Sequence, residues 1–349
     1  MPIVPLLTTP LTDLALGATG LTDLDLGATG LTDLALRATG LTDLALRASG
    51  ASDDVLRWED LGLVEGISIG PFTLRFYALA YLFGILLGYW LLARMSQRPG
   101  SPLTRDQVDT LIFAVTIGII AGGRLGYATF YNPELWTSLD VLKVWEGGMS
   151  FHGGLIGVLL AVGWVAWREK LDVLRVTDYV ATVVPIGMTL GRLANFINGE
   201  LWGRPGDVPW AMVFPGAGPE PRHPSQLYQA GLEGLTVLVV VTYLFWRTRA
   251  RWRPGLLAGV FAIGTGLGRF VVEFFREPDA QLTWLVDATG LSMGQWLTIP
   301  LVLLGVFLVW RALRRPEITQ AGPAHGEGPG DGARAGTVDP VARDDAGEA

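Results

Sequence analysis

The amino-acid sequence predicts an all-α, polytopic integral membrane protein with seven transmembrane helices. Of its 349 residues, 50% are hydrophobic and only 17% are charged, whereas soluble domains carry roughly 25% charged residues. The mean hydropathy is +0.38. Seven apolar stretches approach the ~20 residues that a helix needs to cross a bilayer. The 46 glycines and 13 tryptophans are typical of membrane helices that pack closely and are anchored at the membrane interfaces.

Residues 1–57 form the first predicted unit, which contains four copies of a decapeptide that begins at Leu11. Such repetition is typical of low-complexity, disordered sequence. An alternative is that translation starts downstream of Met1, in which case the natural chain lacks the repeats. The next methionine is Met95, inside the predicted membrane domain.

The seven apolar stretches lie within residues 58–315, the predicted membrane domain. They cover about 72–93, 108–130, 149–167, 176–198, 226–246, 255–275 and 294–313. Thirteen lysines and arginines follow the first, third, fifth and seventh stretches, and four lie in the other connections. By the positive-inside rule, this asymmetry predicts the N-terminus outside and the C-terminus in the cytoplasm.

The net charge of −7 belongs to the two ends of the chain. Residues 1–57 hold seven acidic and three basic side chains, and residues 316–349 hold seven acidic and two basic side chains, which leaves +2 for the membrane domain. Residues 316–349 are therefore predicted to be a disordered, acidic cytoplasmic tail. This charge balance argues against a nucleic-acid partner. The absence of cysteine excludes a disulfide scaffold, a cysteine-ligated metal and a cysteine nucleophile.

Polar side chains gather near one end of the predicted helices. Ionisable groups inside a bilayer are costly and usually face a cavity or a partner. In the predicted orientation, the outer half of the membrane receives Arg75, Tyr77, Arg124, Tyr127, His152, Arg192, Asn195, Asn198, Glu200, Arg269 and Glu273. Asp178, near the inner end of the fourth stretch, is the main exception. The pattern predicts a site that faces the outer leaflet.

Helical spacing relates several of these side chains. Arg269 and Glu273 are four residues apart, so they share a helix face and can pair, either structurally or as part of a site. Arg192 and Asn195 are three residues apart and also share a face. Arg124 is explained equally well by snorkelling to the interface and by a functional contact.

His152, the only histidine in a predicted helix, becomes a candidate general base because arginines lie at the same depth. Arginine suits phosphate because its planar fork binds two oxygens at once. The combination indicates a site for a phospholipid headgroup, and from the pattern alone both transport and catalysis remain open. The sequence lacks the HExxH pattern of a zinc helix, so neither a metal nor a cofactor is predicted.

Five motifs resemble those of the prolipoprotein diacylglyceryl transferase family. Residues 191–203 (GRLANFINGELWG) resemble the signature of that family. The other motifs are 122–127 (GGRLGY), 147–154 (GGMSFHGG), 222–228 (RHPSQLY) and 269–276 (RFVVEFFR). The resemblance covers roughly residues 62–315 and leaves out the repeats and the tail.

The resemblance implies a multi-pass transferase of the bacterial plasma (inner) membrane, with its active site facing the outer leaflet. Members of the family move the diacylglyceryl group of phosphatidylglycerol onto the lipobox cysteine of exported prelipoproteins. A thioether forms and glycerol phosphate is released, as the first step of lipoprotein maturation. The expected partners are therefore phosphatidylglycerol, prelipoprotein signal peptides with a lipobox cysteine, and membrane lipids, with no cofactor and no nucleic acid.

The same motifs imply individual roles. The expected catalytic residues are His152, Arg192, Arg269 and Tyr77. The expected substrate-binding residues are Arg192, Asn195, Glu200, Gly203, Arg124 and Glu273. A thiol with an unperturbed pKa of ~8.5 must lose its proton to attack, and His152 is the candidate base. Arg192 and Arg269 are expected to hold the phosphate and to stabilise the leaving group.

One position departs from the family pattern, because Thr265-Gly266 stands where family members have Tyr-Gly. A catalytically inactive, lipid-binding relative is therefore one alternative. A lipid or anion transporter is another, and it predicts a second half-site on the inner side. The inner half of the predicted helices offers little beyond Asp178.

Overall fold

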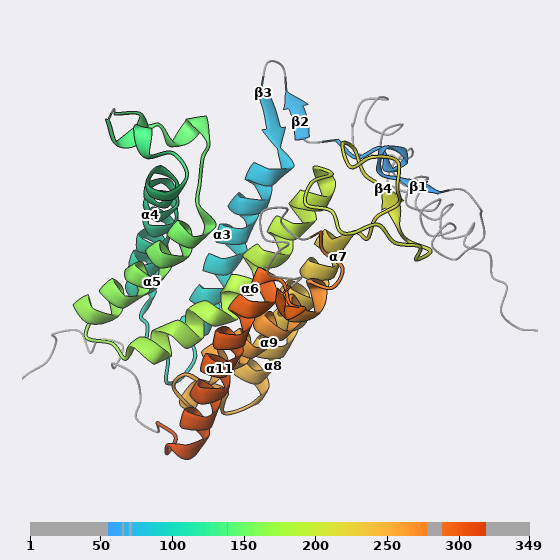
Figure 1. Ribbon diagram of the computed structural model, residues 1–349. Coiled ribbons are helices and arrows are strands. Elements are labelled where there is room, and N and C mark those ends of the chain that lie inside the picture. Colours follow the sequence, from blue (N-terminus) through green and yellow to red (C-terminus); the bar gives the residue numbers. More distant parts are fainter. Residues whose placement is uncertain (1–54, 65, 70–71, 138, 278–287, 319–349) are drawn as a thin grey trace, which may run out of the picture.

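The computed structural model describes residues 55–64, 66–69, 72–137, 139–277 and 288–318. The disorder predicted for most of the repeat unit and of the tail falls on residues 1–54 and 319–349, which lie outside the described residues. In the described part, long helices form a bundle, and short strands and loops cover one end of it (Figure 1).

Six stretches of helix are long and apolar enough to cross a membrane. They are α3 (Phe76–Ser96), α4 (Arg105–Phe130), α5 (Phe151–Arg168), α6 (Val173–Ile197), the continuous run Ser225–Arg247, and α11 (Met293–Arg314). The run Ser225–Arg247 consists of α7 (Ser225–Gln229), the π-helical segment η6 (Ala230–Leu235) and α8 (Thr236–Arg247). The structure therefore supports a polytopic membrane protein with six clear spans.

The predicted stretch 255–275 forms a shorter helix, α9 (Leu256–Val272), of 17 residues. At 1.5 Å per residue it is about 26 Å long, slightly less than the ~30 Å hydrocarbon core of a bilayer. Helix geometry ends at Val272, and residues 273–275 form a turn. Its length alone therefore does not establish α9 as a span.

Capping side chains explain where two of the long helices begin. Thr104 and Gln107 form a capping box at the start of α4, and Ser292 and Gln295 form one at the start of α11. In each box the two side chains satisfy backbone N–H groups that have no partner within the helix. The other helix boundaries lie within about four residues of those predicted.

The fold is not purely α-helical. Strands β2 (Gly66–Ile69) and β3 (Phe72–Arg75) form an antiparallel hairpin, so α3 begins four residues later than predicted. Strand β1 (Leu56–Arg57) pairs in parallel with β4 (Met212–Val213). The predicted boundary at residue 57 thus cuts through a packed segment.

The cap formed by these strands is attached to α6 through a small apolar core. This core contains Leu56, Trp58, Leu61, Phe196, Met212 and Phe214. The indole N–H of Trp58 donates to the carbonyl of Phe196 at 2.7 Å. Because Phe196 lies in the last turn of α6, the contact holds the cap against that end of the helix.

The long helices pack in pairs, α4 with α5, α9 with α11, and α3 with α6. The α4–α5 pair stands to one side of α3 and α6 (Figure 1). Glycines bring this pair into close contact, because a methyl group on Gly157 would overlap the carbonyl of Gly118. This contact is an example of the close helix packing that the glycine content predicts. Away from the cap, α3, α4, α5, α6, α8 and α9 share a core in which the rings of Tyr179 and Phe245 meet edge to face at 5.3 Å.

Candidate active site

At the end of α6, Arg192 and Asn195 lie one turn apart and their side chains are joined. Arg192 Nη1 donates to Asn195 Oδ1 at 3.3 Å, and Asn195 Nδ2 donates to Glu200 Oε1 at 2.9 Å. Asn195 is 7% exposed, so these two partners hold its amide in place. The predicted shared face of Arg192 and Asn195 is confirmed, and it extends into the loop at Glu200.

A second group of charges lies where η6 passes α9. Glu233 on η6 is buried, and its Oε1 lies 4.0 Å from Arg269 Nη1. Arg269 Nη2 in turn lies 2.8 Å from Glu273 Oε1, so the predicted pair is formed. Gly268 allows this approach, since a Cβ atom there would lie 3.3 Å from Glu233 Cγ.

Glu273 is the centre of the second group. Its Oε1 also accepts a hydrogen bond from Arg276 Nη1 at 2.7 Å, and its Oε2 accepts one from Ser292 Oγ at 3.0 Å. A Cβ atom at Gly294 would lie 2.7 Å from Glu273 Cδ, so the start of α11 closes tightly over the carboxylate. A buried carboxylate needs this number of partners to offset the loss of its hydration.

Arg192 connects the two groups electrostatically. Its guanidinium interacts with Glu233, Arg269 and Arg276. It forms no salt bridge with the residues that the structure describes, and its hydrogen bond to Asn195 goes to a neutral amide. Arg192 therefore keeps donors that an anion could use, and two more guanidinium groups lie nearby. Such an arrangement fits a phosphate, which accepts charge-assisted hydrogen bonds from several arginine N–H groups.

Tyr77, in the first turn of α3, lies at the edge of this cluster. Its side chain interacts electrostatically with Arg192 and Glu200. Its hydroxyl is 3.0 Å from that of Tyr81, and it remains 38% exposed. The structure thus brings together the predicted residues Tyr77, Arg192, Asn195, Glu200, Arg269 and Glu273.

Arg124 has other partners. It is 4% exposed, and its guanidinium donates to the backbone carbonyls of Asp140 at 2.6 Å, Val141 at 3.0 Å and Gly148 at 3.3 Å. It also donates to the carbonyl of Gly147. These bonds hold the segment between α4 and α5 in place and use most of its donors. Substrate binding by Arg124 stays a prediction, and its contacts favour a structural role.

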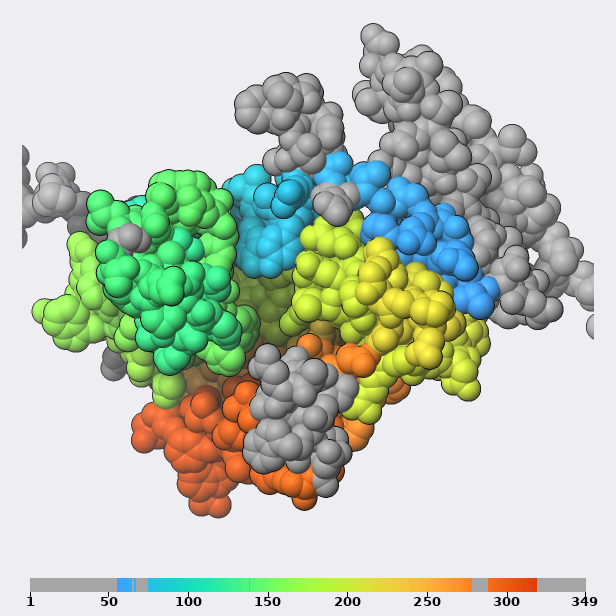
Figure 2. Space-filling model, turned by 45° about the horizontal axis from the view of Figure 1, so that its top comes forward, coloured from blue at the N-terminus to red at the C-terminus, as the bar shows by residue number. Residues whose placement is uncertain are grey.

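His152 lies in the first turn of α5, outside the arginine cluster. It is exposed, and its ring meets that of Phe151 edge to face at 5.6 Å. No hydrogen bond or ion pair within the described chain joins it to Arg192 or Arg269. Figure 2 shows the surface hollowed between the green residues of α4 and its following loop and the yellow-green residues that end α6. The predicted base and the predicted phosphate ligands thus belong to different helix pairs.

Gly203 lets two loops approach the cluster closely. Its N–H donates to the carbonyl of His223 at 2.9 Å, and it forms a β-bridge with Arg276. A Cβ atom there would overlap the carbonyl of Phe275. The contacts give Gly203 a part in positioning Arg276, and its predicted contact with substrate stays a prediction.

Sequence reasoning overlooked several residues of the cluster. Glu233 was missed although a lone carboxylate within the apolar stretch 226–246 is a strong signal of a buried partner. Arg276 lies in a recognised motif but had no assigned role. The contact of Ser292 with Glu273 could not be predicted, because it depends on how α11 returns to α9.

Thr265 marks the departure from the family pattern. Its hydroxyl is buried and has no hydrogen-bond partner among the residues that the structure describes. It therefore does not take up a polar contact with the described cluster.

Comparisons with known proteins identify relatives across the whole bundle. A family model described as prolipoprotein diacylglyceryl transferase matches residues 65–311. The phosphatidylglycerol–prolipoprotein diacylglyceryl transferase of Erythrobacter litoralis is 60% identical over 260 residues, which are 74% of this chain and 92% of that protein. The protein of that name from Zymomonas mobilis is 51% identical over 259 residues, 73% of this chain and 90% of the relative. The protein of that name from Aeromonas salmonicida is 48% identical over 253 residues, which are 72% of this chain and 90% of the relative.

The matched region begins before α3 and ends within α11, so it contains the arginine cluster, His152 and the loops between them. At these identities, a match over nearly three quarters of the chain reflects common descent. This chain belongs to the prolipoprotein diacylglyceryl transferase family.

Proposed function

We propose that this protein transfers the diacylglyceryl group of phosphatidylglycerol to the lipobox cysteine of prelipoproteins. The observation that carries the proposal is Arg192, a partly buried guanidinium that forms no salt bridge within the described chain and interacts electrostatically with Arg269 and Arg276. The names of the relatives, which specify phosphatidylglycerol and prolipoprotein, support the substrates.

The cluster is suited to stabilise a phosphate leaving group. In the proposed step the cysteine sulfur attacks a glyceryl carbon of the lipid, a C–S bond forms, and the C–O bond to phosphate breaks. The electron pair of that bond leaves with glycerol phosphate, and Arg192 stabilises the charge that develops on its oxygens. Glu233 and Glu273 keep Arg269 in position.

His152 is the proposed acceptor of the thiol proton. Because it lies on α5 and the arginines lie on α6 and α9, the reacting thiol would bind between the two helix pairs. Tyr77 and Asn195 border the arginine side of that space and are proposed to orient the headgroup.

We further propose that the protein has seven spans in the bacterial inner membrane, and that α9 is the one added to the six long helices. Gly259 in α9 faces Gly305 in α11, and Gly266 faces Val302, so the two helices run antiparallel over most of their lengths. This packing supports one further crossing of the bundle between α8 and α11. The distribution of basic residues then favours an exterior N-terminus, a cytoplasmic C-terminus and a site open to the outer leaflet.

A transfer assay tests the proposal. Purified full-length protein is mixed with phosphatidylglycerol and a synthetic lipobox peptide, and the expected product is a peptide whose cysteine has gained one diacylglyceryl mass. Arg192→Gln should lower the rate by roughly 10²–10³-fold, the scale of losing one electrostatic stabiliser. Arg98→Gln removes the same charge from a residue that stacks on Trp246 and should leave the rate unchanged. No mass gain with the unmodified protein would refute the proposed function.

A further inference from the structure

The end of the bundle away from the cap carries a repeated aromatic–arginine pair. On three helices an arginine lies four residues after a tryptophan and stacks over its ring: Arg94 on Trp90 at 5.2 Å, Arg168 on Trp164 at 5.2 Å, and Arg314 on Trp310 at 4.9 Å. The spacing places both side chains on one helix face, and a cation is attracted to the face of an indole. Tryptophan is enriched where a membrane meets water. The three pairs therefore mark one membrane interface.

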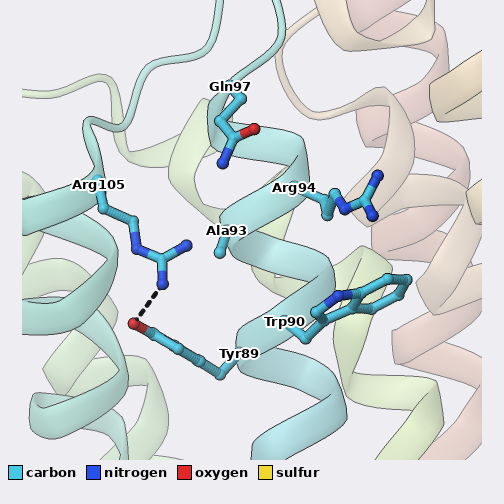
Figure 3. A pocket seen from close by; sticks show the side chains of 6 residues that line it. All are labelled: Tyr89, Trp90, Ala93, Arg94, Gln97 and Arg105. Atoms are coloured by element: carbon cyan, nitrogen blue, oxygen red, sulfur yellow. Dashed lines mark hydrogen bonds between the residues drawn. The ribbon is translucent and has the colours of Figure 1, made fainter.

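The pair on α3 borders a cavity that a second arginine, Arg105, also lines. The cavity has a volume of about 210 Å³ and is lined by Tyr89, Trp90, Ala93, Arg94, Gln97 and Arg105 (Figure 3). Since a water molecule occupies ~30 Å³ in the liquid, the space can hold a group of several heavy atoms. In Figure 3 the side chains of Arg94 and Arg105 lie on opposite sides of Ala93.

The charges around this cavity leave it positive. Arg105 Nη2 donates to the hydroxyl of Tyr89 at 2.7 Å, and that hydroxyl donates to Asp109 Oδ1 at 2.8 Å. Asp109 also lies 3.8 Å from Arg105 Nε, which it partly neutralises. Arg94 forms no salt bridge within the described chain, and its guanidinium lies over the ring of Trp90. One guanidinium is thus left without a counter-charge.

An apolar stripe leads from the cavity toward the middle of the membrane. Leu82, Leu86 and Trp90 follow one another at four-residue intervals on α3, and each is at least 50% exposed. This stripe is continuous with Arg94, and it offers a hydrocarbon chain a surface directly beside the charged group. Free phosphate would make no use of it, whereas a phospholipid would contact both.

We propose that this cavity binds the phosphate of an anionic phospholipid headgroup, in the leaflet opposite the one that Arg192 faces. Seventeen residues of α3 separate Tyr77 from Arg94, which at 1.5 Å per residue is about 26 Å. The two phosphate sites are therefore separated by most of the thickness of the hydrocarbon core. Arg94 and Arg105 bind the headgroup oxygens through their planar forks, the Gln97 amide adds a donor, and the acyl chains lie along the stripe.

The test measures lipid binding to the full-length protein by native mass spectrometry. An Arg192→Gln background removes the contribution of the proposed substrate site. The double variant Arg94→Gln/Arg105→Gln should bind phosphatidylglycerol about tenfold more weakly, the scale of losing charge-assisted hydrogen bonds. The matched control is Arg168→Gln/Arg314→Gln, which removes the same charge from the other two tryptophan pairs and should bind as the parent does.

Three results would overturn the proposal. The first is equal weakening in the matched control, because the effect would then be general surface charge. The second is equal retention of phosphatidylcholine, because the site would then not select an anion. The third is displacement of the lipid by an equal concentration of inorganic phosphate, which would assign the site to the free ion. Circular dichroism checks that each variant is folded, and Arg94→Lys/Arg105→Lys, which keeps both charges, should recover part of the binding.

Discussion

Asp178 on α6 caps the first turn of α9 through the backbone of Gly255. Its Oδ2 accepts a hydrogen bond from the N–H of Gly255 at 2.7 Å, and its Oδ1 accepts one from the N–H of Ala258 at 2.8 Å. A buried carboxylate at a helix N-terminus satisfies otherwise unpaired donors and is favoured by the helix dipole. Asp178, the exception in the distribution of polar residues, thus fastens α9 to α6 at the end away from the arginine cluster.

Replacing this carboxylate should destabilise the bundle. We expect Asp178→Ala to lower the free energy of unfolding by about 2 kcal/mol, because two buried N–H groups lose their acceptor. Unfolding in a detergent titration provides the measurement. Asp172→Ala removes the exposed cap of α6 and should cost less, so an equal loss in both variants would contradict the role given to burial.

The contact between α4 and α5 should tolerate no side chain at Gly157. Gly157→Ala places a methyl group against the Gly118 carbonyl, and backbone cannot move aside as a flexible side chain can. The expected result is a clear fall in melting temperature. Gly163→Ala on the same helix meets open space and should be neutral or slightly stabilising, since alanine is the better helix former by up to ~1 kcal/mol.

Replacing Arg124 should affect the order of the loop after α4 more than it affects lipid binding. Arg124→Ala removes the donors that hold the carbonyls of Asp140 and Val141, so we expect faster proteolysis within residues 131–150. Arg192→Ala, which touches none of these carbonyls, should leave the cleavage rate unchanged. If Arg124→Ala weakened lipid binding without exposing the loop, a direct substrate contact would be the better explanation.

The proposed general base can be separated from the phosphate site by its effect on pH dependence. His152→Gln should slow transfer strongly, and the dependence of the remaining rate on pH should follow the peptide thiol alone. Supplying a peptide whose cysteine is already largely ionised, at high pH, should restore part of the rate. Retention of most activity at neutral pH would contradict the role.

His223 should make stability depend on pH in the acid range. Burial lowers the pKa of this histidine below its usual value, although Asp207 opposes the effect. The unfolded chain therefore binds the proton more readily than the folded one, and stability should fall as the pH drops below about 6.5. Melting temperatures measured from pH 8 to pH 5 should decline less for His223→Gln than for the parent protein.

Much of the bundle could be predicted because membrane helices carry their signal locally. Length, hydropathy and the spacing of basic residues depend on neighbouring positions along the chain, and six of the seven predicted stretches are helices long enough to span. The same local reasoning identified the Arg192–Asn195 and Arg269–Glu273 relations, since both follow from helical periodicity. It failed at residues 72–75, where a β-hairpin replaces the predicted first turn of helix.

The sequence by itself determined the class of protein, the positions of the helices and the family, because these depend on composition, periodicity and linear motifs. Only the tertiary structure decided which polar residues share a site. It placed Glu233 and Arg276 where they interact electrostatically with Arg192, and it paired the Arg124 guanidinium with backbone carbonyls. It also placed His152 on a separate helix pair. The physical reason is that a buried charge is costly unless other groups pair with it, and those groups come from segments far apart in the chain.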